Sequence, residues 1–101
     1  MAFMKMGAIF FLNFQTQTLH YVYVIVSQSK CLRFYVGMTE NKERRLFEHN
    51  MGKTKSTKGY RPWKLFFTEE YKSRSEARER EKYLKSGTGK EMIKKCWHQS
   101  V

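Results

Sequence analysis

FYVGMTENKERRLFEHN, residues 34–50, is the stretch around which the rest of the predicted fold is arranged. Its first three residues are aromatic or β-branched, which favours a strand. Gly37 is predicted to end that strand at a close turn. Thr39 or Asn41 then caps a helix whose first turn is acidic, a favourable place for negative charge. The stretch therefore predicts a strand, a glycine turn and a helix.

The periodicity of this stretch brings three different functional groups together. Alternate strand residues share a face, so one face carries Arg33, Tyr35 and Gly37. Arg45 and His49 are four residues apart and share one face of the helix. A phenol, a guanidinium and an imidazole can then meet at one place, a combination suited to phosphate chemistry.

The charge of the chain favours a polyanionic partner. The 101 residues carry 20 Lys and Arg against 9 acidic residues, a net charge of +11, and 41% hydrophobic residues indicate one folded domain. The surplus is concentrated in the segment 42–64, whose basic residues are Lys42, Arg44, Arg45, Lys53, Lys55, Lys58, Arg61 and Lys64. Such a concentration is typical of a nucleic-acid partner, whereas a generally basic protein is the alternative.

The N-terminal residues and the cysteines indicate the cellular context. The apolar run 7–12 is too short for a membrane span of roughly 20 residues and lacks a signal-peptide pattern. We expect residues 1–19 to be a poorly ordered extension or an edge strand, without membrane association. Cys31 and Cys96 have no spacing typical of a disulfide framework or a zinc site, so we expect a reducing, cytoplasmic location.

An antiparallel hairpin is predicted ahead of the first helix. Residues 21–26 (YVYVIV) are apolar on both faces, which favours a central strand. Residues 27–30 form the turn, and residues 31–37 return as the second strand. Tyr23 and Tyr35 can then lie on the same face of the sheet, although the sequence does not fix the register.

A basic loop, a third strand and two helices follow. Residues 53–61 (KTKSTKGYR) are either a solvated loop or a phosphate-binding loop, whose basic residues are Lys53, Lys55, Lys58 and Arg61. Residues 63–71 predict the third strand. A capping box, Ser73 with Glu76, opens a helix that Gly87 ends.

A second capping box at Thr88 opens a short final helix. The apolar stripe of this helix consists of Met92, Ile93, Cys96 and Trp97. The prediction is an α+β fold, a small three-stranded sheet with flanking helices in the order β-β-α-β-α-α. The domain is expected to span residues 20–97, and residues 98–101 are expected to form a C-terminal tail.

Glu81 is the anomaly in the helix that begins after Ser73. Ala77 and Leu84 lie on the same helix face, so Glu81 projects from the stripe that should face the protein. A carboxylate on a packed face is costly unless a cation meets it. The cation is either a neighbouring Arg or Lys, or a largely hydrated Mg²⁺ or Mn²⁺ that a substrate phosphate completes. Helix geometry alone does not favour one over the other.

These residues together resemble the GIY-YIG nuclease domain, and most closely the small standalone members related to the nuclease domain of excinuclease C. The second motif is present as Tyr35-Val36-Gly37, and Arg45 follows it. The pattern EHN-x-GK occupies residues 48–53, and SRSEARERE, residues 73–81, places Glu81 at the position of the metal-binding glutamate.

The resemblance covers about residues 21–95, and it includes one departure. The segment KYLKSGTGKE, residues 82–91, is similar to one bacterial branch. The first motif reads Tyr21-Val22-Tyr23 and lacks the name-giving glycine and isoleucine. Its tyrosine is kept as Tyr23, so the departure bears on activity more than on fold.

The resemblance implies a metal-dependent endonuclease that hydrolyses DNA phosphodiester bonds, in repair or recombination. Tyr35 would activate or position the attacking water, and Arg45 would stabilise charge on the phosphate. Tyr23 and His49 would orient phosphate and water, with His49 as a second candidate base. Glu81 would hold the single divalent metal, Mg²⁺ or Mn²⁺.

Two other functions remain open at the level of sequence. One is a nucleic-acid-binding module, for DNA or RNA, that keeps the fold but cleaves weakly or not at all. The other is a structural protein, against which the net charge of +11 argues. A single domain leaves little room for a separate specificity module, so we expect weak sequence specificity unless a homodimer or a protein partner supplies it.

Overall fold

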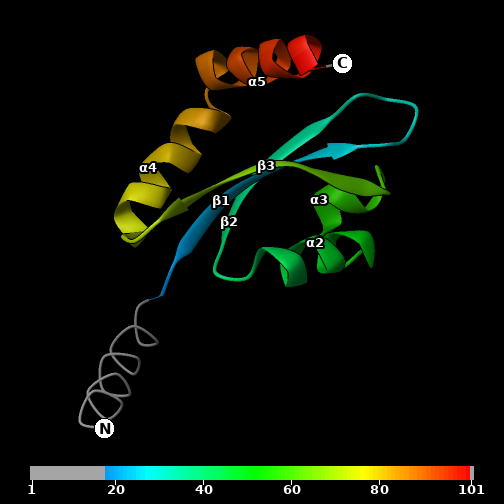
Figure 1. The fold of residues 1–101 in the computed structure, drawn as a ribbon. Helices are drawn as coiled ribbons and strands as arrows, with labels where there is room; N and C mark the ends of the chain where they lie inside the picture. The colour runs from blue at the N-terminus through cyan, green and yellow to red at the C-terminus, as the bar shows by residue number, and fades with distance from the viewer. Residues whose placement is uncertain (1–17, 101) are drawn as a thin grey trace, which may run out of the picture.

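The computed structural model describes residues 18–100 and consists of one antiparallel sheet with helices on both faces (Figure 1). The strands are β1 (His20–Ser27), β2 (Phe34–Thr39) and β3 (Trp63–Tyr71). The helices are α2 (Lys42–Asn50), α3 (Lys55–Lys58), α4 (Arg74–Lys85) and α5 (Gly87–Ser100). The predicted α+β fold is confirmed, with α3 as an additional short helix. The extension expected at the N-terminus lies outside the described residues up to residue 17.

The sheet has the order β2-β1-β3, so the predicted central position of β1 is confirmed. Its residues from Val22 to Ser27 are all buried. β1 and β2 form the predicted antiparallel hairpin, in which Tyr23 pairs with Gly37 and Ile25 pairs with Tyr35. This register places Tyr23 and Tyr35 on one face of the sheet, which the sequence left open.

The prediction that Gly37 ends the strand is wrong, because β2 begins at Phe34 and continues through Gly37 to Thr39. The glycine meets a packing requirement instead of a turn. A Cβ at this position would lie 2.3 Å from the hydroxyl oxygen of Tyr23. Gly37 therefore leaves the space in which the Tyr23 ring lies across β2.

Each face of the sheet has its own hydrophobic core. On the face covered by α4 and α5, the buried residues are Val22, Val24, Val36, Ala77, Leu84 and Ile93. On the face covered by α2, the buried residues are Tyr23, Ile25 and Trp63. The pairing of β1 with β3 is interrupted by a bulge between Val24 and Ile25, which allows both Phe66 and Phe67 to pack on the α4 face.

The first helix follows the predicted capping chemistry. Asn41, and not Thr39, is the N-cap of α2, and its side chain accepts a hydrogen bond from the backbone N–H of Arg44 at 3.0 Å. The helix ends at Asn50, as predicted, and Gly52 has a positive φ of 81°. The expected loop over residues 53–61 is wrong in its centre, where Lys55–Lys58 form the short helix α3 with Thr54 at the N-cap position.

The two C-terminal helices depart from the prediction at their junction. Ser73 caps α4 as predicted, accepting from the backbone N–H of Glu76 at 3.3 Å. Gly87 does not end that helix but is the first residue of α5, and the Ser86 hydroxyl accepts from the backbone N–H of Gly89 at 3.2 Å. Ser86 therefore caps both helices, and the predicted capping box at Thr88 is wrong because Thr88 already lies inside α5.

The last helix, α5, is longer than predicted. It continues through Ser100, so the residues expected as a tail from 98 onward are helical as far as that residue. Ile93 is buried and Trp97 is half-buried, as the predicted stripe requires, but Cys96 is exposed. Both cysteines are exposed free thiols. Within residues 18–100, every helix is too short or too polar to cross a membrane.

Candidate functional site

Two tyrosines, an arginine and a histidine lie between the sheet and α2. Tyr23 comes from β1, Tyr35 from β2, and Arg45 and His49 from α2. The ring of His49 lies 5.8 Å from that of Tyr23 and 4.9 Å from that of Tyr35, measured between centroids. The Arg45 guanidinium faces the Tyr23 phenol. The structure thus brings together the four residues predicted as catalytic, and we call them the α2 cluster.

His49 is fully buried, and both of its ring nitrogens have partners. Nε2 lies 2.8 Å from the Tyr23 hydroxyl oxygen, and Nδ1 lies 2.8 Å from the Thr57 hydroxyl oxygen. The Thr57 hydroxyl donates to the carbonyl oxygen of Thr54 at 3.3 Å, so its oxygen is left to accept from His49. His49 therefore carries its proton on Nδ1, and Nε2 accepts the hydroxyl proton of Tyr23.

Burial sets the protonation states in this chain of hydrogen bonds. It lowers the pKa of His49 to about 4, with a further contribution from the positive charge of Arg45. Burial also raises the pKa of Tyr23 to about 12, although Arg45 opposes this shift. At neutral pH His49 is neutral and Tyr23 keeps its proton, so both act as fixed hydrogen-bonding groups.

Arg45 is half-buried and already contacts one carboxylate. Its Nη1 donates to Oε1 of Glu48 at 3.0 Å, and this hydrogen bond lowers the pKa of the Glu48 carboxyl. Arg44 lies 3.8 Å from the other oxygen of Glu48. Because a guanidinium has five N–H donors, Arg45 can hold Glu48 and still donate to a phosphate.

Glu81 lies on α4 among buried residues, as the helix pattern predicts. Its exposed fraction is 8%, and the neighbouring Ala77 and Leu84 are fully buried. Oε2 of Glu81 lies 3.2 Å from Nζ of Lys85, and Oε1 lies 3.7 Å from Nη1 of Arg78. Lys85 lines one groove together with Tyr35, which connects the Glu81 carboxylate to the Tyr35 side of the α2 cluster.

The single carboxylate of Glu81 suits a hydrated Mg²⁺ or Mn²⁺ better than a metal ion whose ligands all come from the protein. Among residues 18–100, no three His, Cys, Asp or Glu side chains converge on one point. A zinc site with three or four protein ligands is therefore not built in this part of the chain. Mg²⁺ instead binds through one or two carboxylates, with water and substrate phosphate as the other ligands. Glu81 supplies one such carboxylate.

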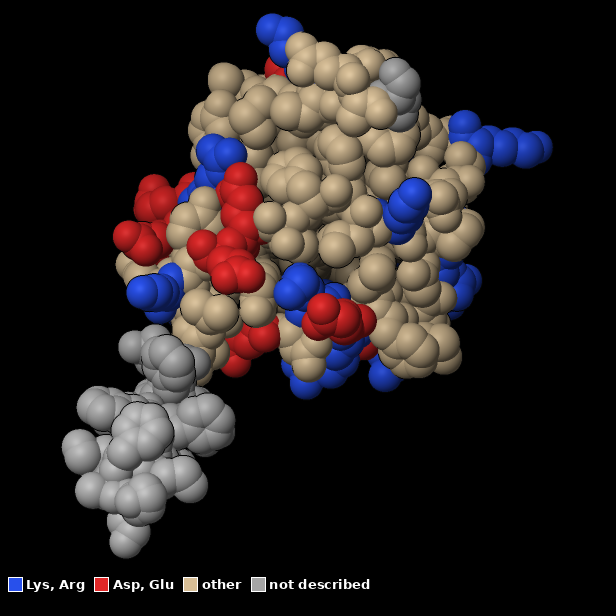
Figure 2. Space-filling model, in the orientation of Figure 1, with Lys and Arg blue, Asp and Glu red and all other residues tan. Residues whose placement is uncertain are grey.

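The four residues predicted to bind nucleic acid are all exposed around α3. They are Lys53, Lys55, Lys58 and Arg61. Nε of Arg61 donates to the carbonyl oxygen of Lys58 at 2.8 Å, which holds the end of this segment against α3. Figure 2 shows most of the acidic side chains of this face gathered on one side, bordered by basic side chains, and a smaller mixed group of acidic and basic side chains lower on the same face. Acidic and basic side chains are therefore interspersed on this face.

Thr57 is the residue of this site that the sequence did not reveal. It lies in the segment expected to present its hydroxyls to solvent, yet it is fully buried and holds His49. Its carbonyl oxygen also accepts from Nε1 of Trp63 at 2.8 Å. The Asn50 side chain bonds both backbone groups of Trp63, at 2.7 and 3.0 Å. These contacts anchor the middle of the basic segment to His49 and hold the residue Trp63, just after the segment, against the end of α2.

Comparison with known protein families matches residues 19–95 to the GIY-YIG catalytic domain. The chain belongs to the GIY-YIG family. The match extends from before Tyr23 to beyond Glu81, so the whole α2 cluster and the α4 carboxylate lie inside the GIY-YIG domain. The resemblance predicted from the motifs is confirmed, and the chain is a member of a nuclease family.

Several small relatives of this GIY-YIG protein are similar along most of its length. A UPF0213 protein of Natronomonas pharaonis is 44% identical over 68 residues, which cover 66% of this chain and 78% of the relative. A UPF0213 protein of Staphylococcus haemolyticus is 40% identical over 76 residues, 74% of this chain and 90% of the relative. A UPF0213 protein of Clostridium perfringens is 33% identical over 84 residues, 82% of this chain and 88% of the relative. No solved structure matches the chain.

Proposed function

We propose that this GIY-YIG protein is a metal-dependent endonuclease that hydrolyses phosphodiester bonds in DNA, in repair or recombination. The observation that carries the proposal is the α2 cluster together with the Glu81 carboxylate, whose partner Lys85 lines one groove with Tyr35, inside a domain of a nuclease family. Phosphodiester hydrolysis requires a positioned water, a cation for the phosphate charge and an oxygen ligand for a metal. Tyr35, Arg45 and Glu81 supply these three functions in the proposal.

Tyr35 is the better candidate for contact with the attacking water. Tyr23 is committed to His49 through a 2.8 Å hydrogen bond, whereas Tyr35 is half-buried and lines an open groove. His49 has both nitrogens engaged and a pKa lowered to about 4 by burial. We therefore assign Tyr35 to the water, and His49 to holding Tyr23 in place.

Glu81 forms ion pairs with two basic side chains in the structure. Lys85 and Arg78 compensate the buried carboxylate in the free protein, and a buried carboxylate without such partners would be costly. In the proposal, Glu81 releases these partners to hold Mg²⁺ or Mn²⁺. The bound ion would supply positive charge for the phosphate and the leaving oxygen.

The basic segment around α3 supplies contacts to the DNA backbone. Lys53, Lys55, Lys58 and Arg61 are exposed and carry charges suited to phosphate oxygens. Phosphate contacts carry no sequence information, so we propose weak sequence specificity unless a second copy or a protein partner adds base contacts. The two exposed free thiols suit a reducing, cytoplasmic location.

A second function is favoured by one specific observation. The ion pairs of Glu81 with Lys85 and Arg78 satisfy the carboxylate without a metal. If those pairs persist when nucleic acid binds, the protein is a DNA- or RNA-binding module that does not cleave. The two functions predict opposite results in a nicking assay.

The deciding experiment is nicking of supercoiled plasmid and labelled branched DNA with Mg²⁺ or Mn²⁺. We expect cleavage by the wild type, and loss of activity by about 10²–10³-fold in Tyr35→Phe and Arg45→Ala. Tyr83→Phe and Arg44→Ala are matched controls that should cleave normally, since Tyr83 is exposed and Arg44 lies on the same helix as Arg45. Binding without cleavage under either metal would favour the non-cleaving module.

A further inference from the structure

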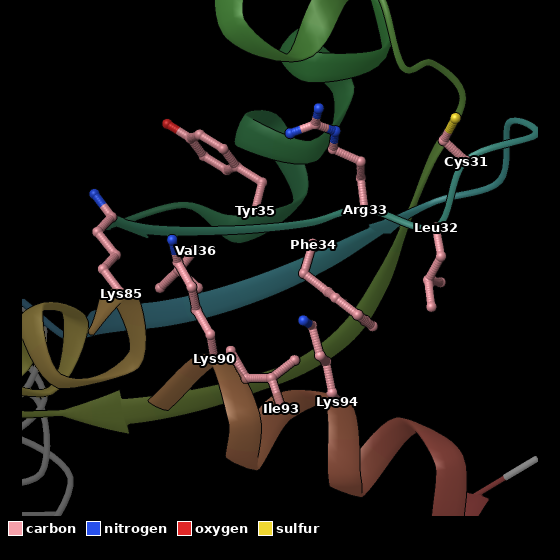
Figure 3. Close-up of a pocket in the computed structure, with 10 residues that line it drawn as sticks. All are labelled: Cys31, Leu32, Arg33, Phe34, Tyr35, Val36, Lys85, Lys90, Ile93 and Lys94. Atoms are coloured by element: carbon pink, nitrogen blue, oxygen red, sulfur yellow. The ribbon is translucent and has the colours of Figure 1, made fainter. Parts of the chain in front are cut away.

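A second basic surface borders the open edge of β2, away from the segment around α3. Within the described part of the chain, β2 pairs with β1 alone, so its outer edge has no neighbouring strand. A groove of about 550 Å³ follows this edge, between β2 and the helices α4 and α5 (Figure 3). We call it the β2 groove.

The charged residues that line the β2 groove are all basic. They are Arg33, Lys85, Lys90 and Lys94. Figure 3 shows Lys90 and Lys94 extending from α5 toward β2, with Lys85 reaching in from the end of α4. Among residues 18–100, no acidic side chain lines the groove, although Glu81 pairs with Lys85, which does line it. Such a groove attracts a chain of negative charges.

The remaining lining of the β2 groove is largely apolar. Leu32, Phe34, Val36 and Ile93 contribute to it. Leu32 is half exposed, and Phe34 packs edge-on against Trp97 behind the groove with ring centroids 5.8 Å apart. A duplex presents phosphates and sugars to such a surface, whereas an unpaired strand also presents the faces of its bases. A basic groove with an apolar floor therefore matches an unpaired strand better than a duplex.

The groove is continuous with the site of the proposed chemistry. Tyr35 lines it, and Lys85 both lines it and contacts Glu81 at 3.2 Å. We propose that the β2 groove binds an unpaired stretch of nucleic acid strand directly adjacent to the scissile phosphodiester. The inference rests on the proposed nuclease function and narrows its substrate to DNA with a single-stranded segment at the cleavage point, such as a flap, a branch or a frayed end.

The test measures binding without cleavage, in metal-free buffer. The probes are a fluorescent oligothymidine of about 15 nucleotides, near the upper site size of small single-strand-binding domains, and a duplex of equal length. The groove variant is Lys90→Gln with Lys94→Gln. The control is the double variant Lys72→Gln with Lys95→Gln, which also removes two positive charges. Lys95 lies on α5 like Lys90 and Lys94, and neither control residue lines the groove.

We expect the groove variant to bind the oligothymidine about tenfold more weakly than the wild type, and the control variant to change by less than about threefold. The salt dependence of log affinity should become shallower by about 1.4, since two phosphate contacts to a single strand are removed. Equal affinity of the groove and control variants would overturn the proposal. So would a change of oligomeric state in the groove variant, measured by light scattering, because the groove would then be an interface between copies.

A second pair of variants tests the apolar floor. Leu32→Ala should weaken binding of the oligothymidine by about threefold to tenfold and leave duplex binding unchanged, because only bases reach the floor. Met51→Ala is the control, since Met51 is similarly exposed and does not line the groove. Equal losses on both probes would refute an unpaired-strand site.

These binding measurements do not depend on catalysis. A protein that binds the oligothymidine as expected but never cleaves DNA would therefore refute the proposed function and leave the binding site of the β2 groove intact.

Discussion

Replacing Gly37 with alanine is the sharpest structural perturbation that the site offers. The added Cβ would lie 2.3 Å from the Tyr23 hydroxyl oxygen, and 2.5 and 2.8 Å from two ring carbons. All three distances are below any normal contact. Tyr23 is 3% exposed and lies between the sheet and α2, so its ring has little space into which to move.

The expected cost follows from two consequences of that clash. Crowding an extra methyl group into a packed core costs about 1–3 kcal/mol. If the ring is displaced, the 2.8 Å hydrogen bond between Tyr23 and His49 is lost, which costs about 1 kcal/mol more. We therefore expect Gly37→Ala to lower the free energy of unfolding by about 2–4 kcal/mol. The same displacement should abolish cleavage even at temperatures where the variant stays folded.

Urea unfolding of Gly37→Ala beside Gly59→Ala checks this reasoning. A Cβ at Gly59 would meet nothing within 4 Å, and its φ is −77°, so alanine there should be neutral or stabilise by roughly 0.4–1 kcal/mol. In the background of Tyr23→Phe, the cost of Gly37→Ala should fall by about 1 kcal/mol, because the hydrogen bond is already gone. A Gly37→Ala protein as stable as the Gly59→Ala protein would refute the packing argument.

Three further predictions concern stability. Burial lowers the pKa of His49 to about 4 against 6.5 in the unfolded chain, so the unfolded chain takes up the proton first. The free energy of unfolding should therefore be constant above about pH 7 and fall by roughly 2 kcal/mol by pH 5. Urea unfolding at several pH values would detect this loss, and the variant His49→Gln should not show it. Thr57→Val leaves Nδ1–H of His49 without its acceptor and should cost about 1–3 kcal/mol by the same assay; a loss under about 0.5 kcal/mol would contradict the assigned tautomer. Arg80→Lys breaks a two-point contact with Glu69, at 2.9 and 3.0 Å, and should lower stability by up to about 1 kcal/mol, whereas Arg78→Lys on the same helix should change it less.

The strands and the N-cap of α4 could be predicted because local chemistry determines them. The apolar run of β1, the strand 63–71 and the Ser73 cap each depend on neighbouring residues in the sequence. The α2 cluster was predictable for a related reason. Strand alternation and the four-residue helical spacing fix which side chains share a face, whatever the details of packing.

The predictions are wrong where contacts between residues distant in the sequence determine the local structure. Gly37 looks like a turn glycine, but its role is to admit the ring of Tyr23 from the neighbouring strand. Thr57 looks like a solvent-facing loop residue, but its hydroxyl is the partner of His49. Ser86 caps α5 because two helices meet there, and the capping pattern of each helix alone did not show it. Tertiary contacts of this kind leave no periodic signal.

The β2 groove shows that functional surfaces formed by residues distant in the sequence could not be predicted either. Arg33 lies far from Lys85 and Lys90 in the sequence, and the folding of α5 beside the edge of β2 places them along one surface. In the sequence, the basic surplus of residues 42–64 drew attention to the loop instead. A charge cluster in sequence and a charge cluster in space are different observations, and here they predict two separate contacts with the substrate.

The most direct test of the account is the single-turnover cleavage rate of Glu81→Gln on labelled branched DNA with Mn²⁺. Glu79→Gln is the matched control, because it is an exposed glutamate on the same helix. We predict a loss of about 10²–10³-fold for Glu81→Gln, with unchanged DNA binding, and a rate within about twofold of wild type for Glu79→Gln. Cleavage by Glu81→Gln at the wild-type rate, or a wild type that binds DNA and never cuts it with either metal, would contradict the assignment of this site as a nuclease centre.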